Sequence, residues 1–372
     1  MPTIIFKPTE KCNSNCIYCD VIVKKSPKTM PIGMLELVFK KIDEYLQALP
    51  EERMTLIWHG GEPCLLGVDY YKKALEFQDA HCSLTKSRID HAMQSNLTLI
   101  TQELVDVFRQ LGIDQIGTSY EPIPHTRGFG KNRDSEAYNR GFMDGINLLN
   151  ENGMGWGIIY VVTRRSLQMP LDIFYFLTNL KPGFVLNPVL VYEGEDFHGI
   201  GITPLEFADF LGAIFPVWWK TRHRYPEVDP FRSMLRNVSE GARHLGCGDS
   251  GECAFSHSYI GPSGEASHCG RAGDWSIVSY GNIQERSLME IFSDEQRRQF
   301  GKRNEVLPQS DCKDCRFWGI CHGGCPLDAY NKHKDFMHKT EWCGAKRVFI
   351  EKYFEPITGL SAQFGLNTEQ VT

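Results

Sequence analysis

The chain has 372 residues, of which 42% are hydrophobic and 23% charged, and its formal net charge is −6. A chain of this length is too long to fold around one small hydrophobic core, so we expect a large domain of about 200 residues or more and a smaller one. The negative charge and the lack of a basic run argue against nucleic acid as a partner. There is no apolar stretch of about 18 residues and no signal-peptide layout at residues 1–10, so we expect no membrane partner and a cytoplasmic location.

Runs rich in β-forming residues alternate along the chain with segments of helical periodicity. The predicted strands are residues 3–6, 54–58, 89–94, 113–119, 156–162 and 184–191. Helical periodicity is clearest at 34–49, 102–112 and 139–153. This alternation is typical of a parallel α/β sheet. Six units fall short of the eight of a closed barrel, so we predict a partial, TIM-like (β/α)6 barrel, with a doubly wound sheet as the alternative.

Eleven of the thirteen cysteines form two groups, and in a reducing compartment such clustering indicates metal binding or catalysis. Cys64 and Cys82 stand alone and are expected to be buried thiols. Cys12, Cys16 and Cys19 lie in one short loop after the first predicted strand. Three thiolates can hold three irons of a 4Fe-4S cluster and leave the fourth iron open. A zinc site completed by a histidine is the alternative, but the nearest histidine, His59, is far along the chain.

The C-x3-C-x2-C spacing, with Tyr18 before the last cysteine, resembles the cluster loop of the radical S-adenosylmethionine (SAM) superfamily. The sequence GGEP at 60–63, after the second strand, resembles that family's motif for the methionine amino group. The resemblance implies that SAM chelates the open iron. The residues that it assigns to SAM lie at or after the ends of four successive predicted strands: Tyr18, Gly60, Gly61, Glu62, Pro63, Gln94 and Ser119. In a parallel sheet these strand ends share one face.

The eight remaining cysteines resemble the SPASM extension, which carries two auxiliary 4Fe-4S clusters in many peptide-modifying radical enzymes. By this resemblance the ligands of the first auxiliary cluster are Cys247, Cys253, Cys269 and Cys325, and those of the second are Cys312, Cys315, Cys321 and Cys343. Three 4Fe-4S clusters are therefore expected, with two zinc sites as the alternative for the second group. The implied domains are a radical SAM barrel, a linker, the SPASM domain and a C-terminal helix with a tail, at 1–229, 230–246, 247–345 and 346–372.

The whole pattern is similar to anaerobic sulfatase-maturating enzymes and to maturases of ribosomally made peptides. Sulfatase maturases carry an aspartate after the third SPASM cysteine, where it is taken to be the general base, whereas this chain has Gly270. We therefore predict a maturase that cross-links a peptide, with sulfatase-type oxidation of Ser or Cys to formylglycine as the alternative. In either case a 5′-deoxyadenosyl radical removes hydrogen from a peptide or protein substrate, after reduction by a flavodoxin or ferredoxin.

A proton acceptor is still required, and four residues near predicted strand ends or cluster cysteines are candidates. They are Glu121, His268, Asp274 and Glu193. Each is more often a solvated or structural group than a base. Two other classes of function remain open at this point, namely radical dehydrogenation of a small molecule and non-enzymatic electron transfer.

Overall fold

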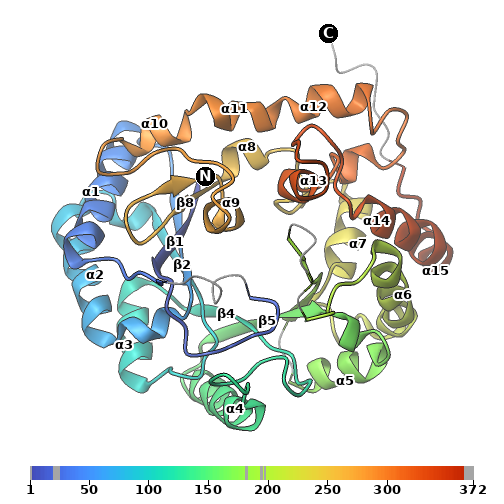
Figure 1. Cartoon of the computed structure of the whole chain (residues 1–372), viewed down its shortest axis with the longest axis horizontal. Coiled ribbons are helices and arrows are strands. Elements are labelled where there is room, and N and C mark those ends of the chain that lie inside the picture. Colours follow the sequence, from blue (N-terminus) through green and yellow to red (C-terminus); the bar gives the residue numbers. More distant parts are fainter. Residues whose placement is uncertain (1, 20–25, 181–182, 193–195, 197, 364–372) are drawn as a thin grey trace. The chain divides into compact units, whose positions relative to one another are not determined.

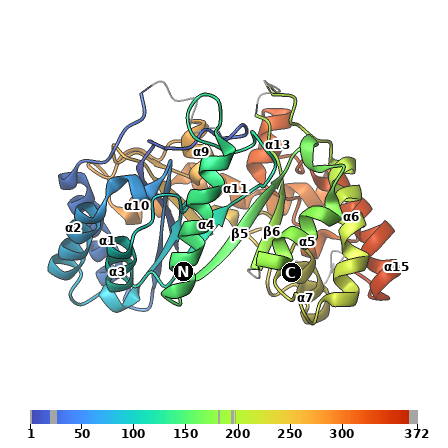
Figure 2. The same cartoon turned by 90° about the horizontal axis from the view of Figure 1, so that it is seen from below.

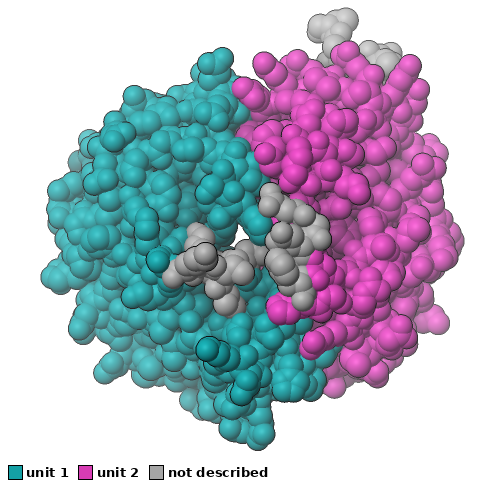
Figure 3. Space-filling model, viewed as in Figure 1, with its two compact units in different colours: residues 1–157, 255–298 teal, residues 158–254, 299–372 magenta. Residues whose placement is uncertain are grey.

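The computed structural model describes residues 2–19, 26–180, 183–192, 196 and 198–363. These residues form two compact units, each built from two stretches of the chain (Figure 3). The first unit comprises 1–157 and 255–298, and the second comprises 158–254 and 299–372. This division into compact units does not test the predicted domain boundaries at 229 and 246, which therefore remain a prediction. The segment predicted as a linker, 230–246, contains a ten-residue helix, α7.

The first unit contains a sheet in the order β4-β3-β2-β1-β8-β9. Its strands are β1 (Thr3–Thr9), β2 (Met54–Gly60), β3 (Ile89–Gln94), β4 (Gln115–Ser119), β8 (His257–Ile260) and β9 (Ala266–Ser267). The pairs β1–β2, β2–β3, β3–β4 and β1–β8 are parallel, and β8–β9 is antiparallel. β5 (Gly155–Val162) runs from the first unit into the second, where β6 (Gly183–Pro188) pairs in parallel with β7 (Val228–Asp229). The prediction of a mostly parallel α/β sheet is confirmed, and all six predicted runs are strands.

Helices α1, α2 and α3 pack in sequence along the outside of the strands in the first unit (Figures 1 and 2). The helical segments of this part of the chain are α1 (Ile32–Ala48), η2 (Pro63–Leu66), α2 (Val68–His81), η3 (Lys86–Arg88), α3 (Gln102–Leu111) and α4 (Ser135–Glu151). α3 begins where the Thr101 side chain accepts from Leu104 N, and it ends at Gly112 in the left-handed region (φ 86°). α1 and α4 begin earlier than the sequence periodicity predicts, at Ile32 and Ser135.

Aromatic side chains fill the space between this sheet and its helices. The ring of Trp58 on β2 meets Phe6 edge-on at 4.9 Å and Tyr71 of α2 at 5.2 Å, and Tyr71 meets Phe108 of α3 at 4.8 Å. Trp58 and Tyr71 are fully buried. Truncating such a ring to alanine costs about 3–5 kcal/mol. This packing fixes the strands whose carboxyl ends carry the GGEP and cysteine loops.

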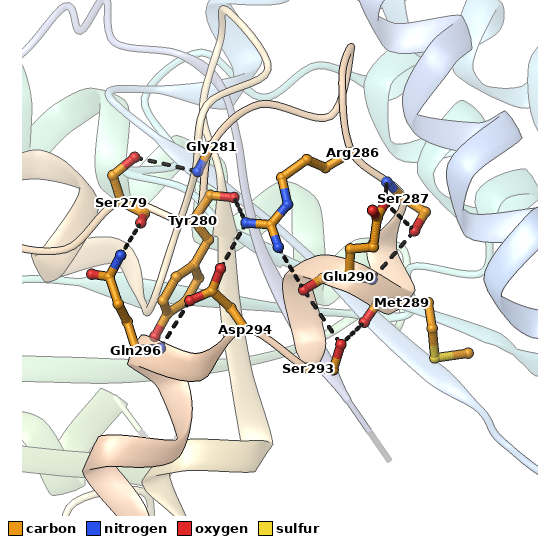
Figure 4. Close-up of polar contacts among 10 residues, drawn as sticks. All are labelled: Ser279, Tyr280, Gly281, Arg286, Ser287, Met289, Glu290, Ser293, Asp294 and Gln296. Atoms are coloured by element: carbon orange, nitrogen blue, oxygen red, sulfur yellow. Dashed lines mark hydrogen bonds and ion pairs between the residues drawn. The ribbon is translucent and has the colours of Figure 1, made fainter.

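Polar contacts hold the part of the first unit that follows β9, where the helices are short: α9 (Gly270–Asp274), α10 (Leu288–Phe292) and the start of α11 (Glu295–Gly301). Arg286 donates to Asp294 at 2.6 Å, to the carbonyl of Tyr280 at 2.7 Å and to that of Glu290 at 3.0 Å (Figure 4). Ser287 caps α10 by accepting from Glu290 N at 3.2 Å. These bonds connect the loop before α10 to α10 and α11.

The second unit has a largely aromatic core, in which α6 packs against α14. Phe215 and Trp218 of α6 meet Phe231 of α7, and Phe215 also meets Phe349 of α14. Its remaining helical segments, with α8 reaching into the first unit, are η4 (Arg164–Ser166), α5 (Pro170–Leu180), α6 (Pro204–Thr221), α7 (Phe231–Glu240), α8 (Cys253–Ser256), α12 (Arg303–Val306), η5 (Leu307–Gln309), η6 (Trp318–Ile320), α13 (Pro326–His333), α14 (Cys343–Phe349), η7 (Ile350–Phe354) and α15 (Glu355–Thr358). No helix among the described residues is both long and apolar enough to span a membrane.

Candidate active site

The GGEP loop and the cysteine loop meet backbone to backbone at the carboxyl ends of β1 and β2. Gly61 N donates to Thr9 O at 2.9 Å, and Glu62 N donates to Lys11 O at 2.8 Å. A Cβ atom at Gly60 would lie 2.2 Å from Thr9 O, and one at Gly61 would lie 2.1 Å from Lys11 O. Gly60 also has a φ of 132°, which disfavours any residue with a side chain. Both glycines are therefore required for this close approach.

Glu62 connects the GGEP loop to the end of β3. Its fully buried carboxylate accepts from Cys64 N at 2.8 Å, from Ser95 Oγ at 2.8 Å and from Asn96 N at 2.7 Å. Burial raises the pKa of Glu62, and the hydrogen bonds oppose that rise. These contacts give Glu62 a positioning role within the protein, while contact of the motif with SAM remains a prediction.

Asn96 extends this network into the cysteine loop. Its side-chain amide donates to Asn13 Oδ1 at 2.8 Å and to Ser14 Oγ at 3.0 Å, and Ser14 N donates to Cys12 Sγ at 3.4 Å. Two predicted SAM-binding residues also meet here, because Gln94 Nε2 donates to Ser119 Oγ at 3.4 Å. The structure thus brings together the loops that follow β1, β2, β3 and β4.

Glu121, a candidate base, is buried in a cluster with Tyr18 and Arg127. Tyr18 Oη donates to Glu121 Oε2 at 2.7 Å, and Arg127 Nε donates to the same oxygen at 2.6 Å. Arg127 also donates to Tyr18 Oη. Because Glu121 is only 2% exposed and is fixed by a buried guanidinium, its surroundings favour an anchoring role over proton transfer. Arg127 has no sequence motif, so sequence reasoning missed it.

The donor set of the first loop suits an iron–sulfur cluster. Cys12, Cys16 and Cys19 lie in one loop and form no disulfide bond, and burial raises the pKa of Cys12 to about 11 and that of Cys16 to about 12. Thiols in such surroundings ionise when a metal replaces the proton. No three His, Cys, Asp or Glu side chains within the described ranges converge on a position for a single metal ion. Cys64 and Cys82 are buried, as predicted.

The four cysteines predicted to hold the second auxiliary cluster line one cavity of about 360 Å³ in the second unit. They are Cys312, Cys315, Cys321 and Cys343. Lys339 and Lys346 line the same cavity and supply positive charge near the thiols. Of the other predicted set, Cys247, Cys253 and Cys325 belong to the second unit and Cys269 to the first.

Arg303 is a buried side chain of the cysteine-rich region that the sequence did not single out. Its guanidinium donates to Gly324 O at 3.0 Å and to His338 O at 2.8 Å. Burial lowers its pKa, and the nearby thiols, with that of Cys325 contributing most, act in the opposite direction. Arg303 therefore fastens the loop before Cys325 to the segment that leads to Cys343.

The other candidate bases differ in their surroundings. His268 is fully buried, its Nδ1 lies 2.9 Å from Tyr280 Oη, and burial lowers its pKa to about 3. Asp274 is bound by Lys7 Nζ, at 2.6 Å to Oδ1 and 2.5 Å to Oδ2. Glu193 lies outside the described residues. Of the two that the structure describes, His268 is fully buried, whereas Asp274 has a charged partner and a partly exposed side chain.

Two family models match this chain. The Radical SAM superfamily model matches residues 6–177, and the SPASM iron-sulfur cluster-binding domain matches residues 247–316. The chain is a radical SAM enzyme with a SPASM domain. This finding confirms the predicted radical SAM and SPASM domains and favours an enzyme over a non-enzymatic electron carrier. The iron–sulfur description of the second model also favours iron over zinc for the cysteine-rich segment.

Several sulfatase-maturating enzymes resemble this radical SAM enzyme over most of its length. The serine-type anaerobic sulfatase-maturating enzyme of Bacteroides thetaiotaomicron is 27% identical over 87% of this chain and 82% of its own. The cysteine-type anaerobic sulfatase-maturating enzyme of Clostridium novyi is 23% identical over 96% of each chain.

Solved structures show the same fold at lower identity. Native anSMEcpe with bound AdoMet and Cp18Cys peptide has a TM-score of 0.82 and 20% identity, covering 96% of this chain and 98% of that one. Streptococcus suis SuiB bound to precursor peptide SuiA has a TM-score of 0.63 and 16% identity, covering 92% and 76%. At these identities the structural likeness establishes the fold alone.

Proposed function

We propose that this radical SAM enzyme oxidises a serine or cysteine side chain of a peptide or protein substrate. The observation that carries the proposal is the likeness, over 87% and 96% of the chain, to two relatives named as anaerobic sulfatase-maturating enzymes. The sequence alone favours cross-linking of a ribosomally made peptide. The comparisons give more support to its alternative, sulfatase-type oxidation to formylglycine.

The proposed cofactors are SAM and three 4Fe-4S clusters, one held by Cys12, Cys16 and Cys19 and two by the eight SPASM cysteines. When bound and reduced, they supply a 5′-deoxyadenosyl radical that removes a hydrogen atom from carbon, and they accept the surplus electron. A flavodoxin or ferredoxin is the proposed source of the first electron. None of these eleven cysteines forms a disulfide bond, which supports this assignment.

The protein's own residues position these groups. Gly60 and Gly61 bring the backbone of the GGEP loop against the cysteine loop, and Glu62 holds that loop to the end of β3. Gln94 and Ser119, in contact at 3.4 Å, stand at the next two strand ends. We propose that this edge of the sheet binds the methionine and ribose parts of SAM.

A cross-linking reaction is the second candidate, and Gly270 is the observation that favours it. α9 begins at Gly270, where sulfatase maturases are taken to carry their base. A Cβ atom at this position would meet only Ile5 Cγ2, at 3.4 Å. The missing carboxylate is therefore not a consequence of crowding.

The test compares the peptide products of the reconstituted enzyme. The anaerobic enzyme receives SAM and dithionite together with the Cp18Cys peptide, its serine analogue or any short peptide found to be encoded beside the gene. Mass spectrometry then localises the change, and a hydrazine reagent traps an aldehyde. A hydrazine-reactive product at Ser or Cys supports the proposal. Loss of two hydrogens at an aromatic residue, without an aldehyde, supports cross-linking, and deoxyadenosine release with unaltered peptides points to a small-molecule substrate.

A further inference from the structure

A partly buried ion pair lies near the carboxyl end of β1. The ammonium of Lys7 contacts both oxygens of Asp274, and the two side chains are 1% and 13% exposed. Burying two charges is costly, and hydrophobic residues of similar volume often stabilise such a site equally well. The pair therefore needs a reason other than stability.

The register of α9 on β1 shows where this carboxylate lies. Ile5 and Lys7 share one face of β1, and Gly270 and Asp274 share one face of α9. Gly270 lies over Ile5, because a Cβ atom there would be 3.4 Å from Ile5 Cγ2, and Asp274 lies over Lys7. Four helical residues rise about 6 Å and two strand residues about 6.6 Å, so the two pairings are consistent. Asp274 thus stands one helical turn closer than Gly270 to the carboxyl end of β1.

The same pair adjoins the GGEP loop. A Cβ atom built at Gly60 would lie 3.0 Å from Lys7 Cγ, so the stem of Lys7 packs directly against the first glycine of the motif. His59, the residue before it, accepts from Gly60 N through Nδ1 at 2.7 Å, which leaves Nε2 to carry the ring proton. Burial first, and then the charge of Lys7, lower the pKa of His59 to about 4, so the ring is neutral at pH 7. Asp274 is therefore the acidic member of a polar group formed with Lys7 and His59.

We propose that Asp274 is the proton acceptor for the substrate hydroxyl or thiol. It would replace the aspartate that sulfatase maturases carry at the position of Gly270. This inference rests on the proposed oxidation of a Ser or Cys side chain. The O–H or S–H bond of the substrate breaks, its proton passes to a carboxylate oxygen of Asp274, and the aldehyde or thioaldehyde double bond forms. The hydrogen atom on carbon and the remaining electron leave through the SAM and iron–sulfur chemistry of the loaded enzyme. Lys7 keeps its proton and holds the carboxylate in place.

The experiment compares Asp274→Asn and Asp274→Glu with a matched control, Asp294→Asn. Like Asp274, Asp294 is paired with a cation, in this case Arg286 at 2.6 Å (Figure 4), and it is 12% exposed and belongs to the same unit. We expect Asp274→Asn to lower aldehyde formation at least about hundredfold. Deoxyadenosine release and iron content should stay within about twofold of the wild type, and Asp274→Glu should regain at least a tenth of the wild-type rate. Asp294→Asn should leave the ratio of aldehyde to deoxyadenosine unchanged.

Thermal melting of the metal-free chains provides a readout that does not depend on activity. Under the proposal, Asp274→Asn and Asp294→Asn lower the melting temperature by similar amounts, although only Asp274→Asn uncouples the reaction. Equal loss of aldehyde, deoxyadenosine and iron in Asp274→Asn would show that the pair is structural and overturn the inference. So would a glutamate variant no better than the asparagine. Wild-type enzyme that forms no aldehyde on any peptide would instead overturn the proposed function, and this inference with it.

Discussion

Two groups of clustered cysteines each lie within one compact unit, and the surrounding protein holds these two groups in different ways. The loop of Cys12, Cys16 and Cys19 follows a regular strand, and side chains such as Asn96 and Glu62 tie its surroundings to neighbouring strand ends. The cavity of Cys312, Cys315, Cys321 and Cys343 lies among short helical turns, with left-handed backbone at positions such as Asp314, His322, Gly323 and Gly324. We infer that the protein shapes the first loop by itself, whereas the second region depends on a bound metal cluster for its rigidity.

The largest expected effect concerns the different chemical roles proposed for the two groups of cysteines. Replacing Cys12, Cys16 and Cys19 with alanine should abolish deoxyadenosine production, because no other group in the proposed mechanism can activate SAM. Most of the iron, bound by the eight SPASM cysteines, should remain. Cys82→Ala, which removes a buried thiol away from both groups, is the control for a non-specific effect of cysteine loss. Iron loss shared equally by all sites would contradict the division into one open and two closed clusters.

The second prediction concerns the dependence on metal. Removing iron should expose residues 307–343 to protease much more than residues 54–119. The reason is that metal ligation replaces regular secondary structure in residues 307–343 but not in residues 54–119. Limited proteolysis followed by mass spectrometry locates the cuts before and after chelation. Equal protection of both segments in the metal-free protein would show that the second region has a self-sufficient core.

The third prediction concerns Arg127, which anchors the loop of Cys12, Cys16 and Cys19 through Glu121 and Tyr18. Arg127→Met leaves the buried carboxylate of Glu121 without its guanidinium partner, so we expect a loss of about 3–5 kcal/mol in the free energy of unfolding. Arg140→Met removes an exposed i,i+4 partner of Glu136 on α4 and should cost less than about 0.5 kcal/mol. Urea denaturation of the metal-free proteins measures both. Similar losses in the two variants would mean that the loop is not anchored through Arg127.

The smallest effect is a pH-dependent one beside the second region. Arg316 donates to both oxygens of Glu355 at 2.9 Å, and this hydrogen bonding lowers the pKa of Glu355. A lowered pKa stabilises the fold at neutral pH, and that contribution is lost as the pH falls through the lowered value. Glu355→Gln should therefore cost at most about 1 kcal/mol at pH 7 and progressively less in acid. A difference between variant and wild type that grows on acidification would reverse the sign and contradict this account.

The sequence predicts the strands and the loops after them well, because alternation of apolar runs and the carboxyl-end rule are local signals. GGEP and the cysteine spacing mark their loops for the same reason. Lys7 and Asp274, by contrast, lie 267 positions apart, and no local pattern pairs them. Arg127 and Arg303 act through tertiary contacts with backbone and carboxylate groups, which no spacing reveals. Glu121 followed a strand as predicted, but only the fold shows that Arg127 and Tyr18 bind it.

The backbone contact between Thr9–Lys11 and Gly60–Glu62 has a consequence for exchanging segments between related enzymes. No side chain stands between these two loops that could adjust to a new partner, since even a methyl group at Gly61 would overlap Lys11 O. A chimera that receives the cysteine loop from one parent and the GGEP loop from another must therefore match two main chains to within a few tenths of an ångström. The two loops, although about 50 residues apart in the chain, behave as a single transplantable part.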